Sequence, residues 1–101
     1  MAKFTYFNSQ STTDAAIRFG DRLRRMRKAQ GRTLADLEAS TRIHRHTIAR
    51  LEQGDTTVSF SKVLAILESL GELADIELLV SRPDSIRPRI TEFDLPLDRD
   101  F

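Results

Sequence analysis

The segment best suited to chemistry runs from Thr33 to Gly54 and reads TLADLEASTRIHRHTIARLEQG. It contains both histidines of the chain, and its second half carries Arg45, His46 and Arg50 with no acid before Glu52. Arginine can bind O6 and N7 of guanine through two parallel hydrogen bonds. A short helix that is apolar on one face and basic on the other suits the major groove of DNA.

The spacing of the basic residues indicates which side chains would reach bases. Positions i, i+1 and i+5 project together near the start of a helix, and Arg45, His46 and Arg50 occupy them. Ala49 leaves room for a close approach and can contact a thymine methyl. We expect phosphate contacts from polar and basic residues near helix starts. These residues are Thr33, His44, Thr47, Ser59, Ser61 and Lys62.

Four helices are predicted to position these groups. A stripe of Phe19, Leu23 and Met26 predicts a helix over residues 14–30, which Gly31 ends. The possible N-caps of this helix are Ser11, Thr12 and Thr13. Thr33 and Asp36 form a capping-box pattern at the start of the second helix. The third helix spans about residues 45–53, and the fourth spans residues 60–70 between Ser59 and Gly71. Inward-facing positions around the turn are Leu37, Ile43, Ile48 and Leu51.

The ends of the chain have different patterns. Residues 3–8 (KFTYFN) fit an edge strand or an arm, and Ile76, Leu78 and Val80 alternate as in a strand. A lone strand is unstable, so it needs the same strand of a second chain or the KFTYFN segment as its partner. We therefore expect an arm over 1–13, a DNA-binding domain over 14–71, a dimerisation strand over 72–81 and a flexible tail over 82–101.

Composition narrows the class of protein. The net charge of +1 conceals a basic stretch over residues 18–50, with ten Arg or Lys against three acids, and an acidic stretch over 68–101, with nine acids against four arginines. Cysteine is absent, and no apolar run is long enough for a membrane span. His44 and His46 lack a third metal ligand nearby, and no catalytic motif is present. We expect no cofactor, no metal, no enzymatic activity and a cytoplasmic, nucleoid-associated location.

Residues 19–71 resemble the Xre/Cro-type helix-turn-helix family, which has the lambda-repressor-like fold. The resemblance rests on FGDRLRRMRKAQGRTLADLE, IHRHTIARLEQGD and SFSKVLAILESLG. It implies a mainly α bundle of four to five helices and a structural salt bridge between Arg27 and Glu52. The chain departs from the family pattern at Leu34, Glu38, Arg42 and His44. At Arg42 the family often has glycine, so the resemblance implies either a strained turn conformation at Arg42 or a different turn.

A strand after the fourth helix resembles HipB-like antitoxins, in which strands of two subunits pair. The resemblance implies a homodimer interface at Ile76, Leu78 and Val80, and a tail that binds a protein toxin. We therefore expect a repressor of an inverted-repeat DNA site that is also the antitoxin and autoregulator of a toxin–antitoxin operon. Two alternatives remain open: a free-standing phage-type or operon-controller repressor, and a module that binds protein and not DNA.

Overall fold

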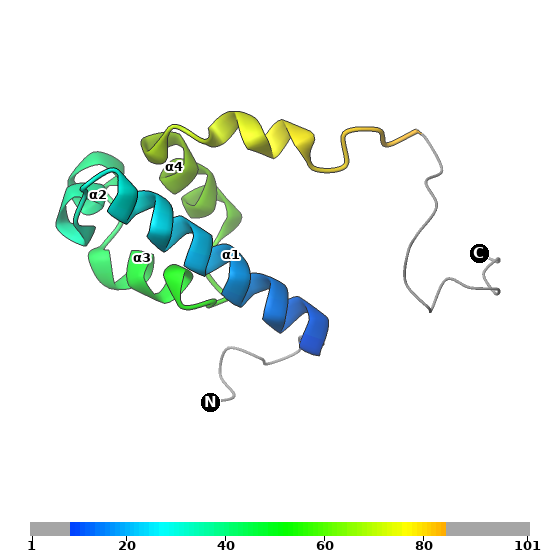
Figure 1. Cartoon of the computed structure of the whole chain (residues 1–101), viewed down its shortest axis with the longest axis horizontal. Helices are drawn as coiled ribbons and strands as arrows, with labels where there is room; N and C mark the ends of the chain where they lie inside the picture. The colour runs from blue at the N-terminus through cyan, green and yellow to red at the C-terminus, as the bar shows by residue number, and fades with distance from the viewer. Residues whose placement is uncertain (1–8, 85–101) are drawn as a thin grey trace.

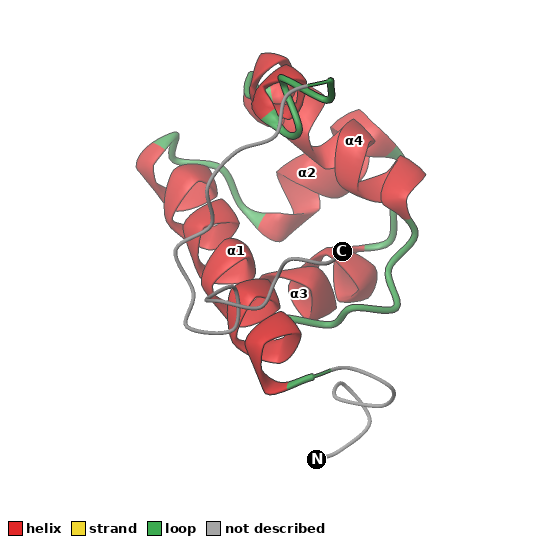
Figure 2. Ribbon diagram, turned by 90° about the vertical axis from the view of Figure 1, so that its right-hand side faces the viewer, coloured by secondary structure: helices red, strands yellow, loops and turns green. Residues whose placement is uncertain are grey.

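In the computed structural model, which describes residues 9–84, the regular elements are all helical (Figures 1 and 2). The elements are α1 (Gln10–Ala29), α2 (Leu34–Thr41), α3 (Arg45–Glu52), α4 (Phe60–Leu70) and a 3-10 helix (Leu73–Leu78). The predicted mainly α bundle is thus confirmed for the described part of the chain. The KFTYFN segment and most of the predicted tail lie outside the described residues.

Helix α1 begins earlier than the sequence pattern predicted. Its N-cap is Ser9, which has an extended backbone and whose side-chain Oγ accepts from the Thr12 N–H at 3.0 Å. None of the three expected caps fills this position, because all three lie inside the helix, where Thr13 is buried. Helix α1 therefore begins at Gln10, before the predicted start at residue 14. The C-terminal end of α1, at Ala29, is close to the predicted end at residue 30, and Gly31 follows it with a φ of 70°.

Helices α2 and α3 meet in a turn that contains no glycine. The predicted capping box at the start of α2 is present, with Thr33 Oγ1 accepting from the Asp36 N–H at 3.1 Å and Asp36 Oδ2 accepting from the Thr33 N–H at 2.8 Å. At the other end, Arg42 has a φ of 62° and a ψ of 26°, which is the left-handed region. A side chain with a Cβ is disfavoured there by roughly 1–2 kcal/mol.

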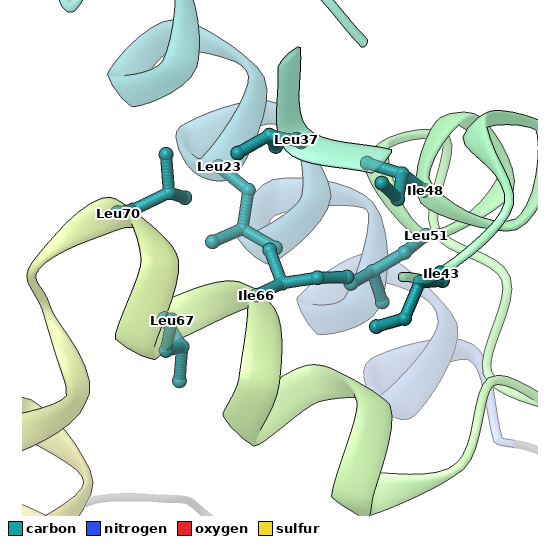
Figure 3. Close-up of a cluster of buried hydrophobic side chains, with 8 residues drawn as sticks. All are labelled: Leu23, Leu37, Ile43, Ile48, Leu51, Ile66, Leu67 and Leu70. Carbon is teal, nitrogen blue, oxygen red and sulfur yellow. The ribbon is translucent and has the colours of Figure 1, made fainter. Parts of the chain in front are cut away.

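The core lies between the four α-helices (Figure 3). The inward positions predicted around the turn are all buried, with Leu37 and Ile48 fully inaccessible. The buried apolar side chains are Leu23 from α1, Leu37 from α2, Ile43 from the turn, Ile48 and Leu51 from α3, and Ile66, Leu67 and Leu70 from α4. This core fixes how α3 sits against the other three helices, and so it fixes which face of α3 remains exposed.

The strand predicted over residues 72–81 does not form in the described chain. Residues Leu73–Leu78 form a 3-10 helix that follows α4 (Figure 1). The i, i+3 pair of Leu73 and Ile76 packs against the core, which a strand of the same sequence could not arrange. Of the three predicted interface residues, Ile76 is therefore partly buried, whereas Leu78 and Val80 are exposed.

Within residues 9–84, no helix is long and apolar enough to cross a membrane.

Candidate nucleic-acid interface

Helix α3 has one buried face and one exposed basic face. Ile48, Leu51 and Glu52 are the buried residues. Arg45, His46 and Arg50 are exposed, as the i, i+1, i+5 spacing predicted. Ala49 and Thr47 are partly buried beside them. The structure thus brings the four predicted base-contacting residues onto one helix with its polar side toward solvent.

A buried ion pair fixes α3 to α1. Arg27 donates from Nε to Glu52 Oε2 at 2.8 Å and from Nη2 to Glu52 Oε1 at 3.0 Å, and the two side chains are only 9% and 6% exposed. Arg27 Nη1 also donates to the Arg32 carbonyl at 3.0 Å. The hydrogen bonding of Arg27 to the Glu52 carboxylate is the main reason that the pKa of Arg27 is raised above its ordinary value. The pair that the family resemblance implied is present, and it holds α1, α3 and the α1–α2 turn together.

A second feature of the α1–α3 contact was missed in the sequence. Gly20 is buried in α1, and a Cβ placed there would collide with the Leu51 carbonyl and lie 2.6 Å from the Glu52 carbonyl oxygen. The two helices therefore touch backbone to backbone. The available signal was a glycine inside a strongly helical stretch, since glycine in a helix is unfavourable by about 1 kcal/mol relative to alanine.

Arg45 forms a salt bridge that joins α2 to the start of α3. Its Nε donates to Glu38 Oε1 at 2.8 Å, with the side chains 53% and 32% exposed. This hydrogen bond is the main cause that lowers the pKa of Glu38 below its ordinary value. Glu38 is one of the positions at which the chain departs from the resembled family, and its carboxylate reaches outward to Arg45.

Arg50 forms a similar bond to the loop after α3. Its Nε donates to Asp55 Oδ2 at 2.7 Å, and Asp55 Oδ1 accepts from the Thr57 N–H at 2.8 Å and from Thr57 Oγ1 at 2.6 Å. The Asp55 side chain is 3% exposed. Burial alone would raise the pKa of Asp55, but the hydrogen bonds from Thr57 and Arg50 outweigh it and lower the pKa. Sequence reasoning missed this contact.

The two histidines lie side by side at the start of α3. His44 is the N-cap, and its Nδ1 accepts from the His46 N–H at 3.1 Å. This bond places the proton of a neutral His44 ring on Nε2, which leaves an N–H for an outside acceptor. The ring centroids are 4.7 Å apart. In the described part of the chain, no group of three or more metal-ligating side chains occurs.

Of the predicted phosphate contacts, His44 and Thr47 lie at the start of α3, and the other four lie at the starts of α4 and α2. Ser59, Ser61 and Lys62 are exposed at the start of α4, where Ser59 Oγ caps the helix by accepting from the Lys62 N–H at 3.4 Å. At the start of α2, the N–H of Thr33 is already bound by Asp36. The Asp36 carboxylate lies where an anion would approach the helix N-terminus. The hydrogen bond from the Thr33 backbone is the main cause that lowers the pKa of Asp36. The start of α4 is therefore the better of the two for a phosphate.

Comparison with known proteins gives one match. Residues 18–78 match the family model described as "Helix-turn-helix domain". No curated protein and no solved structure gives a significant match. The matched span covers more than half of the 101 residues and includes α2, the left-handed turn at Arg42 and α3. With its braced α3 and exposed basic face, the chain belongs to the helix-turn-helix domain family.

Proposed function

We propose that the protein is a sequence-specific DNA-binding regulator that acts as a repressor. One observation carries the proposal: α3 exposes Arg45, His46 and Arg50 on one side and buries Ile48 and Leu51 on the other. In helix-turn-helix proteins the second helix of the motif enters the major groove and its N-terminal residues contact base edges. Arg45 and His46 are the first two residues of α3.

We propose that the regulator is a homodimer that binds an inverted repeat. Leu78, Leu79 and Val80 are consecutive and 69%, 63% and 72% exposed. Three adjacent apolar side chains in water favour a contact with another chain. A two-fold dimer would place its α3 helices in half-sites about 34 Å apart. This contact needs no strand, so the proposal survives the loss of the predicted strand.

DNA selection from a random duplex library tests the proposal. We expect an enriched inverted repeat and an affinity that falls steeply with salt, because phosphate contacts release counterions. Arg45→Ala should lower affinity for the selected duplex by about 1–3 kcal/mol and flatten the preference at one base pair. No enrichment of any sequence, together with salt-insensitive binding, would favour a protein-binding module.

Oligomeric state is tested separately by sedimentation. Leu78→Asp should weaken self-association and binding to the inverted repeat together, because it introduces a charge into the exposed apolar run. Ala74→Asp is the matched control, since Ala74 is exposed in the same 3-10 helix. A tight dimer that survives Leu78→Asp would remove this segment from the interface.

The acidic C-terminal stretch bears on whether the regulator has a protein partner. We propose that the regulator is an antitoxin that represses its own operon; the second candidate is a free-standing repressor. The acidic stretch over residues 68–101 supports a protein partner, because it contains nine acidic residues and only four arginines. Pull-down from the native host distinguishes the two: a co-purified product of the neighbouring gene supports the antitoxin, and DNA without a protein partner supports the free-standing repressor.

A further inference from the structure

The two arginines that face outward from α3 share a feature. Each uses Nε to bind a carboxylate from another element, Arg45 to Glu38 of α2 and Arg50 to Asp55 of the α3–α4 loop. A guanidinium has five N–H groups in a rigid planar fork. A bond at Nε leaves the Nη1–Nη2 edge, at the far end of the side chain, for an outside pair of acceptors. Guanine presents such a pair in O6 and N7.

Of the two carboxylates, Asp55 is held more rigidly than Glu38. Asp55 is 3% exposed, and its other oxygen is fixed by both the N–H and the hydroxyl of Thr57. The Arg50 side chain is 48% exposed above it. Glu38 accepts a bond from Arg45 at a similar distance but is 32% exposed. An exposed pair is screened by water and orders two flexible side chains for little gain.

Electrostatic repulsion alone makes Glu38 and Asp55 unfavourable beside a DNA-binding face. A carboxylate on a DNA-facing surface repels phosphate, and so it weakens binding to every sequence. Orientation of the bound arginine is a benefit that can compensate for this repulsion. A guanidinium that is already held loses less side-chain entropy when it binds a base, because part of its rotamer freedom is restricted beforehand.

We propose that Asp55 is a positioning residue for Arg50, and Glu38 a weaker one for Arg45, each holding the guanidinium by Nε so that the Nη1–Nη2 edge meets a guanine. The target of this face is then a half-site with two G·C pairs. The inference rests on the proposed function, because it assigns the base chemistry and the sequence preference of that same surface.

The test compares two DNA duplexes of equal length: the duplex selected by the wild-type protein and one that lacks the selected sequence. Asp55→Asn keeps the size of the side chain and an oxygen for Thr57, but it removes the charge that holds Arg50. We expect about tenfold weaker binding to the selected duplex, equal or tighter binding to the other, and a flattened preference at one G·C pair. Glu38→Gln should show the same pattern with a smaller loss.

Two controls separate positioning from other effects. Asp21→Asn removes the same charge from the Asp21–Arg25 salt bridge of α1, whose N–O distance is 2.8 Å, and it should leave the sequence preference unchanged. In an Arg50→Ala background, Asp55→Asn should cause no further loss on the selected duplex, because the side chain to be positioned is gone. Thermal unfolding of each variant identifies any loss that comes from misfolding.

The outcomes distinguish the two levels of the proposal. If Asp55→Asn tightens binding to both duplexes and preserves the G·C preference, the carboxylate is only a repulsive charge and the positioning role is refuted. An undiminished preference in Arg50→Ala would refute a base-reading role for Arg50 and, with it, the positioning role of Asp55. A selected half-site without G·C pairs would also overturn the inference, whereas it would leave sequence-specific DNA binding intact.

Discussion

Removing one partner of the Arg27–Glu52 pair should destabilise the domain strongly. Glu52→Ala leaves the Arg27 charge in a place where its side chain is only 9% exposed. Breaking a buried ion pair in this way typically costs about 3–5 kcal/mol. Domains of this size are stable by roughly 5–15 kcal/mol, so the loss is a large part of the total. The melting temperature should fall by at least about 12 °C, since each kcal/mol corresponds to about 4–8 °C.

Replacing both partners gives the discriminating measurement. Arg27→Met combined with Glu52→Leu leaves no stranded charge, and apolar pairs often replace buried ion pairs without loss. The double variant still loses the bond to the Arg32 carbonyl, which is worth about 1 kcal/mol or somewhat more because the donor is charged. We therefore expect its unfolding free energy, from urea denaturation followed by circular dichroism, to lie within about 2 kcal/mol of wild type. A double variant as unstable as Glu52→Ala would refute the reasoning, as would a single variant that loses less than about 1 kcal/mol.

Three further predictions concern stability. Gly20→Ala should lower the unfolding free energy by about 2 kcal/mol or more despite the better helix propensity of alanine, because its Cβ meets backbone that cannot move aside; an unchanged urea midpoint would contradict the close approach of α1 and α3. Arg42→Gly should raise the unfolding free energy by about 1 kcal/mol, because it removes the Cβ from a left-handed residue. A lower melting temperature would show that the Arg42 side chain stabilises the fold by more than its left-handed backbone conformation costs. The pKa values of Asp36, Glu38 and Asp55 are lowered in the folded state. Their ionised forms therefore stabilise the fold fully above the ordinary carboxyl range, about pH 4–5, and this stabilisation is lost as the pH falls through the lowered pKa values. Urea midpoints measured downward from pH 6 check this, and Asp55→Asn should weaken the dependence.

Local chemistry explains what could be predicted from the sequence. The capping box at Thr33 depends on residues three apart, and burial of Leu37, Ile48 and Leu51 follows from helical spacing. The resembled family often has glycine where Arg42 stands, which implies either a strained turn or a different one, and the left-handed φ of Arg42 corresponds to the first. These features depend on short stretches of chain, so a pattern in the sequence is sufficient to find them.

The missed features depend on how elements cross. The Arg45–Glu38 bond joins the ends of two helices, and it exists only at the angle at which α2 and α3 meet. The Arg50–Asp55 bond had a partial signal, since an acid directly after a helix-ending glycine often forms a turn with the residue two positions later. The alternation of Ile76, Leu78 and Val80 suggested a strand, but packing of Ile76 on the core selects a 3-10 helix instead.

The backbone contact at Gly20 has a consequence for how this domain could change its target. The position of α3 is set by Gly20, by the Arg27–Glu52 pair and by apolar side chains on its buried face. None of these groups lies on the exposed face. The outer residues of α3 could therefore be exchanged for those of another regulator while the docking of the helix is retained. Such grafts should recognise new operators only if the supporting acids, Glu38 and Asp55, are exchanged with the side chains they hold.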